Sequence, residues 1–214
     1  MEDILYKYSP LNRLNVSRET YLDFELFISM IIKKNSEINI ISKKTAKNSI
    51  IRERHIIDSA QAIDFIDIND NICSDLGAGA GLPGVALAIM MKNLNKSMKF
   101  KLYEKSHLKS AFLRDVTRKL NLNIEIVEGD IFKKINLRSD TVVGRAFKPL
   151  PVVLELMNKN FVNYKNLILF MGKNGKETLK DAFKDWKFEY KEKMSLTSDD
   201  SFLIKIKNIK KKIE

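Results

Sequence analysis

Residues 75–84 read Asp75-Leu76-Gly77-Ala78-Gly79-Ala80-Gly81-Leu82-Pro83-Gly84, with a glycine at every second position from 77 to 81. The apolar run Ile72–Leu76 predicts a strand that leads into these glycines. Behind them, Pro83–Met91 is apolar on nearly every face and predicts a buried helix with Pro83 in its first turn. The segment therefore predicts a strand, a glycine-rich turn and a helix in direct succession.

A strand–turn–helix unit of this kind places a ligand at the carboxyl end of a parallel sheet. Its glycines let the backbone approach the ligand closely, and the helix N-terminus offers free N–H groups to a carboxylate or phosphate. Glycine triplets also occur in turns that only pack helices. The surrounding strand and helix patterns are what favour a binding site for a nucleotide-type ligand.

Strand and helix patterns alternate after this turn. Four apolar runs read as further strands: Phe100–Tyr103, Ile124–Val127, Val142–Val143 and Leu167–Met171. Between the first two, Ser106 predicts the cap of a helix whose buried face carries Leu108, Phe112, Val116 and Leu120. This alternation implies parallel pairing in a doubly wound sheet.

The C-terminal part of the chain has a different pattern. Phe188–Ser195 and Phe202–Ile206 read as two strands joined by the polar turn Thr197-Ser198-Asp199-Asp200, which leaves no room for a helix. We therefore expect an antiparallel hairpin at the edge of the parallel sheet.

The N-terminal part predicts helices. Ser17 to about Lys33 is amphipathic with Ser17 as the N-cap, and a second helical segment extends from about Ser49 to Phe65. The run Ile38-Asn39-Ile40-Ile41 is a short, ambiguous strand signal. We expect an N-terminal helical extension over residues 1–68 and a Rossmann-like domain over residues 69–214.

The composition excludes several classes of protein. Of the 214 residues 44% are apolar, which allows one sizeable domain with a packed core. No apolar run approaches the roughly 20 residues needed to span a bilayer, and Met1-Glu2-Asp3-Ile4 lacks a signal-peptide pattern. The single cysteine, Cys73, cannot form an internal disulfide. We expect a soluble, cytoplasmic monomer without a membrane or metal role.

The chain is strongly basic. Its net charge of +11 comes from 38 lysines and arginines against 27 acidic residues, a balance that suggests a polyanionic partner. The sequence is also rich in Lys, Ile and Asn, a bias of AT-rich genomes that raises the lysine content without any function. On charge alone, contact with nucleic acid is the favoured interpretation.

Two acidic residues stand where a nucleotide ligand needs acceptors. Glu104 ends the second strand, about 20 residues past the last glycine, where a carboxylate takes both ribose hydroxyls, although a solvated strand end would show the same pattern. Asp130 follows the third strand and can accept from an adenine amine. Ile131 and Phe132 would either pack against the adenine ring or be buried in a turn.

NAD and S-adenosylmethionine share these requirements. Three features favour S-adenosylmethionine: Pro83 lies inside the loop, the sheet closes with a hairpin, and too little chain remains for a separate substrate domain.

Several further motifs resemble one family of methyltransferases. They are Arg54-His55 with Asp58-Ser59, the Gly-Leu-Pro-Gly ending of the turn, Phe112-Leu113, Arg145-Ala146-Phe147, and Lys173 in Gly172-Lys173-Asn174-Gly175. With these motifs the chain resembles the RsmG (GidB) family from about Asn39 to Ile206. That family methylates N7 of a guanine in 16S ribosomal RNA of the small ribosomal subunit. The glycine turn and the acidic strand end occur in methyltransferases generally, so the other motifs carry the substrate assignment.

The resemblance implies a Rossmann-like S-adenosylmethionine-dependent methyltransferase fold, an α/β fold with a mostly parallel seven-stranded sheet. With the turn and the acidic residues, it assigns the cofactor site to Asp75, Gly77, Gly79, Gly81, Leu82, Glu104, Asp130, Ile131, Phe132 and Arg145. It implies positioning roles for Arg145, Lys173 and His55, and RNA contacts for Arg54, Lys109, Lys148 and Lys173.

Two positions depart from the family pattern. The family often has Lys-Arg ahead of Phe-Leu, where this chain has Leu108-Lys109, so only Lys109 can serve. The Asn-Leu-Thr segment usual in the family appears here as Asn39-Ile40-Ile41 or is displaced. A role for the threonine hydroxyl of that segment therefore has no support in this chain.

The implied chemistry needs no general base. Guanine N7 has a free lone pair and no proton, so methyl transfer depends on alignment. In A-form RNA this atom lies in a deep, narrow groove, and we expect the target in a loop or splayed out of the stack. Arg145 would position either the cofactor carboxylate or the base, whereas His55 would stack on a base, bond Asp58 or anchor its helix.

Two other functions stay open from the sequence alone. One is methyl transfer to a different substrate, and the other is a non-catalytic nucleotide- or RNA-binding module of the same fold.

Overall fold

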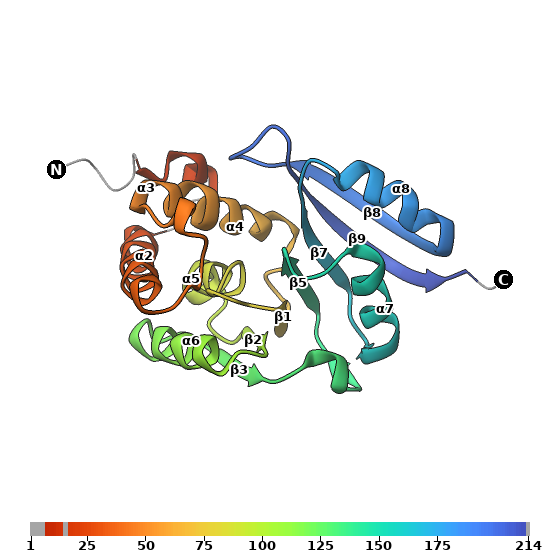
Figure 1. Ribbon diagram of the computed structural model, residues 1–214, viewed down its shortest axis with the longest axis horizontal. Coiled ribbons are helices and arrows are strands. Elements are labelled where there is room, and N and C mark those ends of the chain that lie inside the picture. Colours follow the sequence, from red (N-terminus) through yellow and green to blue (C-terminus); the bar gives the residue numbers. More distant parts are fainter. Residues whose placement is uncertain (1–6, 15–16, 213–214) are drawn as a thin grey trace.

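The computed structural model describes residues 7–14 and 17–212. At its centre lies a seven-stranded sheet with the order β3-β2-β1-β5-β7-β9-β8 (Figure 1). The strands are β1 (Ile72–Leu76), β2 (Lys99–Glu104), β3 (Ile124–Glu128), β5 (Thr141–Arg145), β7 (Asn166–Met171), β8 (Trp186–Met194) and β9 (Phe202–Lys211). The first five of these are parallel, and β9 pairs antiparallel with both β7 and β8. The predicted fold class and the C-terminal hairpin are confirmed.

Helices cover both faces of this sheet (Figure 1). On one face α5 (Gly84–Leu94) and α6 (His107–Lys119) share a core with α2 (Arg18–Glu37). On the other face, α7 (Leu150–Asn160) and α8 (Gly175–Asp185) pack with the hairpin strands. Every residue of α5 from Gly84 to Met91 is buried, as its uniformly apolar sequence predicts. Two short strands, β4 (Leu137–Arg138) and β6 (Phe161–Val162), pair in parallel beside the main sheet.

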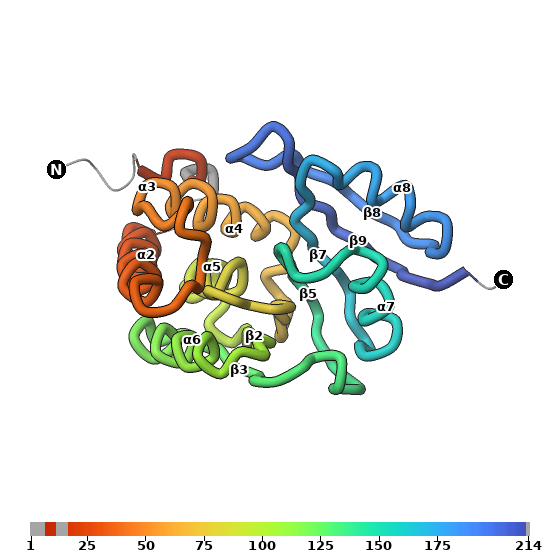
Figure 2. The backbone as a smooth tube through the Cα atoms, viewed as in Figure 1, coloured from red at the N-terminus to blue at the C-terminus, as the bar shows by residue number. Residues whose placement is uncertain are grey.

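The predicted helix from Ser49 to Phe65 is present but is not a regular α-helix. It consists of α3 (Asn48–Ile51), a π-helical segment (Arg52–Ile57), α4 (Asp58–Ala60) and a 3₁₀ segment (Gln61–Phe65). The widened segment contains the Arg54-His55 motif, and π turns within helices often mark functional sites. Figure 2 shows α4 running toward the turn of the β8–β9 hairpin.

Three local predictions differ from the structure. Ser17 occupies the N-cap position of α2, but its hydroxyl makes no capping bond, and the helix continues to Glu37. Residues 38–41 form no strand, because Asn35 Oδ1 accepts from the backbone N–H groups of Ile40 and Ile41 at 2.9 and 3.0 Å. Leu108 is 57% exposed, since it lies in the first turn of α6, outside the face that packs.

The N-terminal helices share their core with the sheet. Side chains of α2 and of the 48–65 segment belong to the same apolar cluster as those of α5 and α6. The division at residues 68 and 69 stays a proposal about sequence organisation. Within residues 7–14 and 17–212, no helix is both long and apolar enough to cross a membrane.

Candidate functional site

A hollow of about 350 Å³ opens around the glycine-rich turn, at the carboxyl ends of β1, β2, β3 and β5. We call it the glycine cleft. Of the residues predicted to bind cofactor or RNA, it is lined by Gly77, Gly79, Glu104, Lys109, Asp130, Ile131, Phe132 and Lys148. Its other lining residues are Tyr103, Lys105, Gly129, Ala146 and Phe147. The strand order reverses between β1 and β5, and open α/β sheets bind ligands at such switch points.

Glu104 fixes the turn from the end of β2. Its side chain is largely buried, with Oε2 accepting from the Gly79 N–H at 2.8 Å. Oε1 accepts from the Ser106 N–H, also at 2.8 Å. Two backbone donors therefore hold this carboxylate in one orientation at the cleft wall, where a ligand hydroxyl would meet a preset acceptor.

The loop after β3 forms another wall of the cleft. Asp130 is exposed, and its Oδ1 accepts from the Phe132 N–H at 3.0 Å, which caps a 3₁₀ turn over Ile131–Lys133. Ile131 is buried, whereas Phe132 is 39% exposed. Of these two side chains, Phe132 therefore presents the larger apolar surface to solvent beside the cleft.

Phe147 lies directly across the turn and was given no role by the sequence. A side chain at Gly77 would place its Cβ 2.4 Å from Phe147 Cδ2, and Gly77 has a φ of +67°. Glycine is thus required there both by its backbone conformation and by the aromatic ring above it. Phe147 also stacks on Phe132, with ring centroids 6.0 Å apart. In the sequence, the only pointer to Phe147 was its place in the family motif Arg145-Ala146-Phe147.

Asp75 lies beneath the turn and does not line the cleft. It is fully buried, and its Oδ2 accepts from the Gly84 N–H at 2.8 Å, which attaches β1 to the start of α5. Its Oδ1 has no hydrogen-bond partner among residues 7–14 and 17–212. Burial raises the pKa of Asp75, the Gly84 N–H opposes this rise and the Glu104 charge supports it, and the net result is a pKa of about 7.

Asp75 is expected to make stability depend on pH. Between its ordinary pKa of 3.8 and about 7, the folded chain holds a proton on Asp75 that the unfolded chain has lost. The free energy of unfolding should therefore fall as the pH rises through this window, by about 1.4 kcal/mol per pH unit from this group. Asp75→Asn keeps an acceptor for Gly84 but cannot titrate. Urea unfolding at pH 4 to 8 should show the difference between wild type and variant changing across this range, and parallel profiles would contradict the assignment.

Gly81 and Leu82 also shape the turn from outside the cleft. Gly81 has a φ of +90°, and a Cβ there would lie 2.5 Å from Val85 Cγ2 and 3.1 Å from Leu113 Cδ2. Leu82 is partly buried against the same apolar cluster. The close packing of the turn on α5 and α6 therefore requires glycine at position 81.

A second hollow of about 460 Å³ lies between the carboxyl ends of β5 and β7 and the starts of α7 and α8. We call it the β5–β7 hollow. It contains Lys173, and it shares Ala146, Phe147 and Lys148 with the glycine cleft. These three residues form a common wall, so a group bound in one hollow would lie next to a group bound in the other.

Arg145 lines neither hollow and is bound to the N-terminal helical segment. Its Nη1 donates to His55 O at 3.4 Å and to Ser59 Oγ at 3.2 Å, and its Nη2 donates to Arg54 O at 2.5 Å. Its Nη2 also lies 3.1 Å from Asp58 Oδ2. Burial lowers the pKa of Arg145, and the Asp58 charge opposes this. The sequence could not supply these partners, which come from 86 to 91 residues away.

His55 lies beside these groups as a neutral side chain. Its Nε2 is buried and has no hydrogen-bond partner in the part of the chain that the structure describes. Burial and, to a smaller extent, the charges of Arg145 and Arg54 together lower its pKa to about 4. Within the described residues His55 does not bond Asp58, one of the roles considered for it, because Asp58 Oδ1 accepts instead from Gln61, Ser195 and Thr197. Arg54 and Lys173 are exposed.

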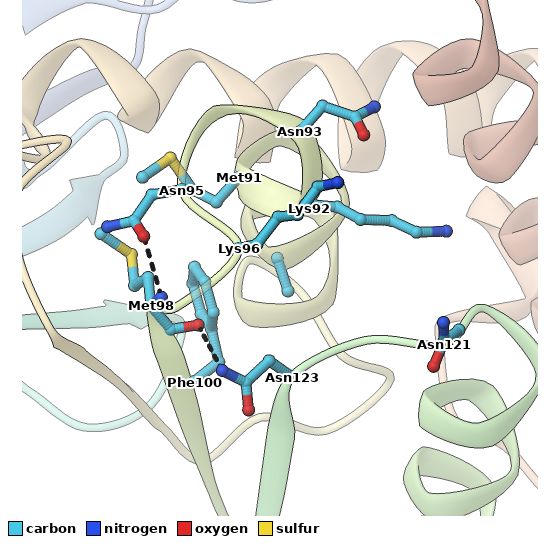
Figure 3. A pocket seen from close by; sticks show the side chains of 10 residues that line it. Met91, Lys92, Asn93, Asn95, Lys96, Met98, Phe100, Asn121 and Asn123 are labelled. Atoms are coloured by element: carbon cyan, nitrogen blue, oxygen red, sulfur yellow. Dashed lines mark hydrogen bonds between the residues drawn. The ribbon is translucent and has the colours of Figure 1, made fainter.

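A further hollow of about 330 Å³ lies at the opposite, amino edge of the sheet (Figure 3). Its amides mainly hold the local turns. Asn95 accepts from the Ser97 and Met98 N–H groups, and Asn123 donates to Met98 O. None of the residues predicted for function lies there.

Comparison with known proteins identifies the family. Residues 20–203 match the GidB family model, described as rRNA small subunit methyltransferase G. The chain belongs to this family. The ribosomal RNA small subunit methyltransferase G of Pelagibacter ubique is 55% identical, over 99% of this chain and 100% of that protein. That of Orientia tsutsugamushi is 37% identical, over 95% of this chain and 98% of its own. The resemblance to the GidB family is confirmed.

Solved structures show the same fold at low sequence identity. A SAM dependent methyltransferase from Aquifex aeolicus aligns with a TM-score of 0.54 at 14% identity, over 71% of this chain and 89% of that one. The tRNA methyltransferase TrmK of B. subtilis aligns with a TM-score of 0.53 at 13% identity, over 70% and 64% of the two chains. The chain thus has the α/β fold of these methyltransferases.

Proposed function

We propose that this chain transfers a methyl group from S-adenosylmethionine to N7 of a guanine in 16S ribosomal RNA of the small subunit. The observation that carries the proposal is membership of the rRNA small subunit methyltransferase G family over residues 20–203. The glycine cleft at the switch point of the sheet supports it. The base and its atom come from the resemblance at Arg54-His55 and Arg145-Ala146-Phe147.

The glycine cleft fits S-adenosylmethionine. A side chain at Gly129 would meet no atom within 4 Å, so the backbone there faces open space. Glu104 offers an oriented acceptor for ribose hydroxyls, Asp130 an acceptor for the adenine amine, and Phe132 an apolar surface. Asp75, Gly81 and Leu82 would serve this site by shaping the turn, since they lie outside the cleft lining.

The target guanine is proposed to occupy the β5–β7 hollow. Its position across the wall Ala146–Lys148 would bring a base beside the cofactor. Val153 and Leu169 supply apolar lining for a base, and the exposed Lys148 and Lys173 can neutralise phosphates. A base enters such a hollow only when unstacked, which favours a target in a loop or a splayed nucleotide.

The work of the protein is alignment. Bound S-adenosylmethionine supplies an electrophilic methyl group on a sulfonium. Guanine N7 offers its lone pair without losing a proton, so no side chain has to accept one. The wall Ala146–Lys148 would fix the distance and angle between the two reactants, and orientation of this kind accounts for a large part of the acceleration of such reactions.

Transfer to the small subunit tests the proposal. Subunits from a strain without this activity, incubated with methyl-labelled S-adenosylmethionine and the protein, should gain label at one guanine of 16S rRNA. Chemical cleavage at N7-methylguanosine then maps the position. Subunits that already carry the methyl group are the control and should gain none.

Absence of label from the rRNA would refute the proposal. Label in a small molecule or a protein would identify a methyltransferase for another substrate. Calorimetry that shows no S-adenosylmethionine binding, but tight binding of NAD or RNA, would identify a non-catalytic module of the same fold.

A ribosomal substrate also agrees with the cytoplasmic location expected from the sequence. The monomeric state stays a prediction, which light scattering on the purified chain would test.

A further inference from the structure

Asp58 joins three parts of the chain that are distant in sequence. Its Oδ1 accepts from Gln61 Nε2 at 2.8 Å, and from Ser195 Oγ and Thr197 Oγ1 in the hairpin turn at 3.0 and 3.2 Å. Its Oδ2 lies 3.1 Å from Arg145 Nη2 at the end of β5. The proposed cofactor and RNA contacts give this carboxylate no task.

Asp58 is also the carboxylate that pairs with Arg145. The other groups that Arg145 contacts through hydrogen bonds are neutral: the carbonyl oxygens of Arg54 and His55 and the hydroxyl of Ser59. Only 20% of the Arg145 side chain and 13% of the Asp58 side chain are exposed. A buried charge needs a paired, hydrogen-bonded partner, so removal of the Asp58 charge would leave the guanidinium uncompensated.

Arg145 connects this pair to the wall between the two hollows. It is the last residue of β5, and the next residue, Ala146, has a φ of +49°. A non-glycine residue in the left-handed region costs about 1–2 kcal/mol and persists where its surroundings fix it. Phe147 follows and lies against Gly77 in the glycine cleft. Arg145, whose side chain is anchored, is therefore followed directly by the strained Ala146 and by Phe147.

We infer that Asp58 is a positioning residue for methyl transfer: by pairing with Arg145 it fixes the wall Ala146–Lys148 that separates the glycine cleft from the β5–β7 hollow. The inference rests on the proposed function, because the two hollows are assigned to methyl donor and base. A loosened wall would disturb the alignment of the reactants. It would disturb cofactor binding less, since neither Asp58 nor Arg145 lines the glycine cleft.

Asp58→Asn tests this role without changing the size of the side chain. Its amide oxygen still accepts from the hairpin turn, but its NH₂ group faces Arg145 in place of a charge. We expect kcat for small-subunit methylation to fall by about 10- to 100-fold, while the Kd for S-adenosylmethionine changes by less than about threefold. The matched control is Ser195→Ala with Thr197→Val, which removes the hairpin donors to Asp58 and leaves Arg145 paired. We expect this double variant to keep kcat within about threefold of the wild type.

Hydrogen exchange measures the wall independently of activity. Asp58→Asn should speed exchange at residues 144–148, and the double variant should not. Unchanged exchange there would overturn this inference even if the wild type methylates rRNA. Failure of the wild type to methylate rRNA would instead refute the proposed function, and the exchange data would still decide whether Asp58 orders the wall.

Two further outcomes would overturn the inference. One is an unchanged kcat in Asp58→Asn. The other is an equal loss of kcat in the double variant, which would show that Asp58 acts by docking the hairpin. Should Asp58→Asn fail to fold, Ser59→Ala removes a single neutral partner of Arg145. It should lower kcat by about 5- to 10-fold, beyond the threefold limit set for the double variant, with faster exchange at residues 144–148. An unchanged kcat and exchange would again count against the inference.

Discussion

Glu104→Ala is expected to weaken S-adenosylmethionine binding by about 100-fold or more and to abolish methyl transfer at ordinary cofactor concentrations. The variant loses the acceptor proposed for two ribose hydroxyls. Hydrogen bonds to a charged group contribute about 1.5–3 kcal/mol each, so losing two of them corresponds to at least about 3 kcal/mol. It also releases the Gly79 and Ser106 N–H groups that the carboxylate holds. Isothermal calorimetry measures the Kd directly.

The chain contains a matched control for this experiment. Glu128 is the register partner of Glu104 on β3, and its carboxylate binds His107 and Arg114 outside the glycine cleft. Glu128→Ala should change the Kd by less than about threefold. Equal losses in both variants would show that the general charge of this edge, and not the position of Glu104, determines binding.

Gly84→Ala is expected to lower the free energy of unfolding by about 3 kcal/mol. A Cβ at Gly84 would lie 2.6 Å from Asp75 Oδ2 and 2.9 Å from Asp75 Cβ. Overpacking a buried site costs about 1–3 kcal/mol, and displacement of the carboxylate would add the loss of its hydrogen bond from the Gly84 N–H. For a chain of 214 residues this corresponds to a fall in Tm of about 6–12 °C.

Gly172→Ala is the control for glycine replacement. A Cβ at Gly172 would meet no atom within 4 Å, so its effect should stay within about 0.5 kcal/mol. Denaturant unfolding of the two variants, side by side, separates the crowding at Gly84 from the general loss of a glycine. A Gly84→Ala variant as stable as Gly172→Ala would contradict the contact with Asp75.

The glycine-rich turn shows how much of the site local sequence could predict. Its strand, turn and helix, and the acidic end of β2, were all placed correctly, because hydrophobic periodicity and glycine positions encode them within about 30 residues. Hydrophobic periodicity and glycine positions did not predict the direction in which each side chain of the site points. Asp75 was expected at the ligand, yet it is buried beneath the turn, because α5 folds back over the end of β1 and brings the Gly84 N–H to it.

Arg145 shows the same limit on a larger scale. The motif predicted a positioning role for Arg145 and left open whether it contacts the cofactor carboxylate or the base. In the structure its partners are Asp58, Ser59 and two backbone carbonyls of a π-helical segment, which the sequence presented as an ordinary helix. A π turn differs from an α turn by one residue in its hydrogen-bond spacing, and hydrophobic periodicity does not register that difference.

The sequence by itself determined the fold class, the position of the glycine-rich turn and the family of this protein. These follow from short-range patterns and from motifs whose order along the chain is enough to recognise them. Tertiary structure alone decided that Phe147 crosses Gly77, that Asp58 joins Arg145 to the hairpin turn, and that two hollows share the wall Ala146–Lys148. The physical reason is that these contacts join residues 70 to 139 positions apart, and only the packing of helices and hairpin on the sheet brings them together.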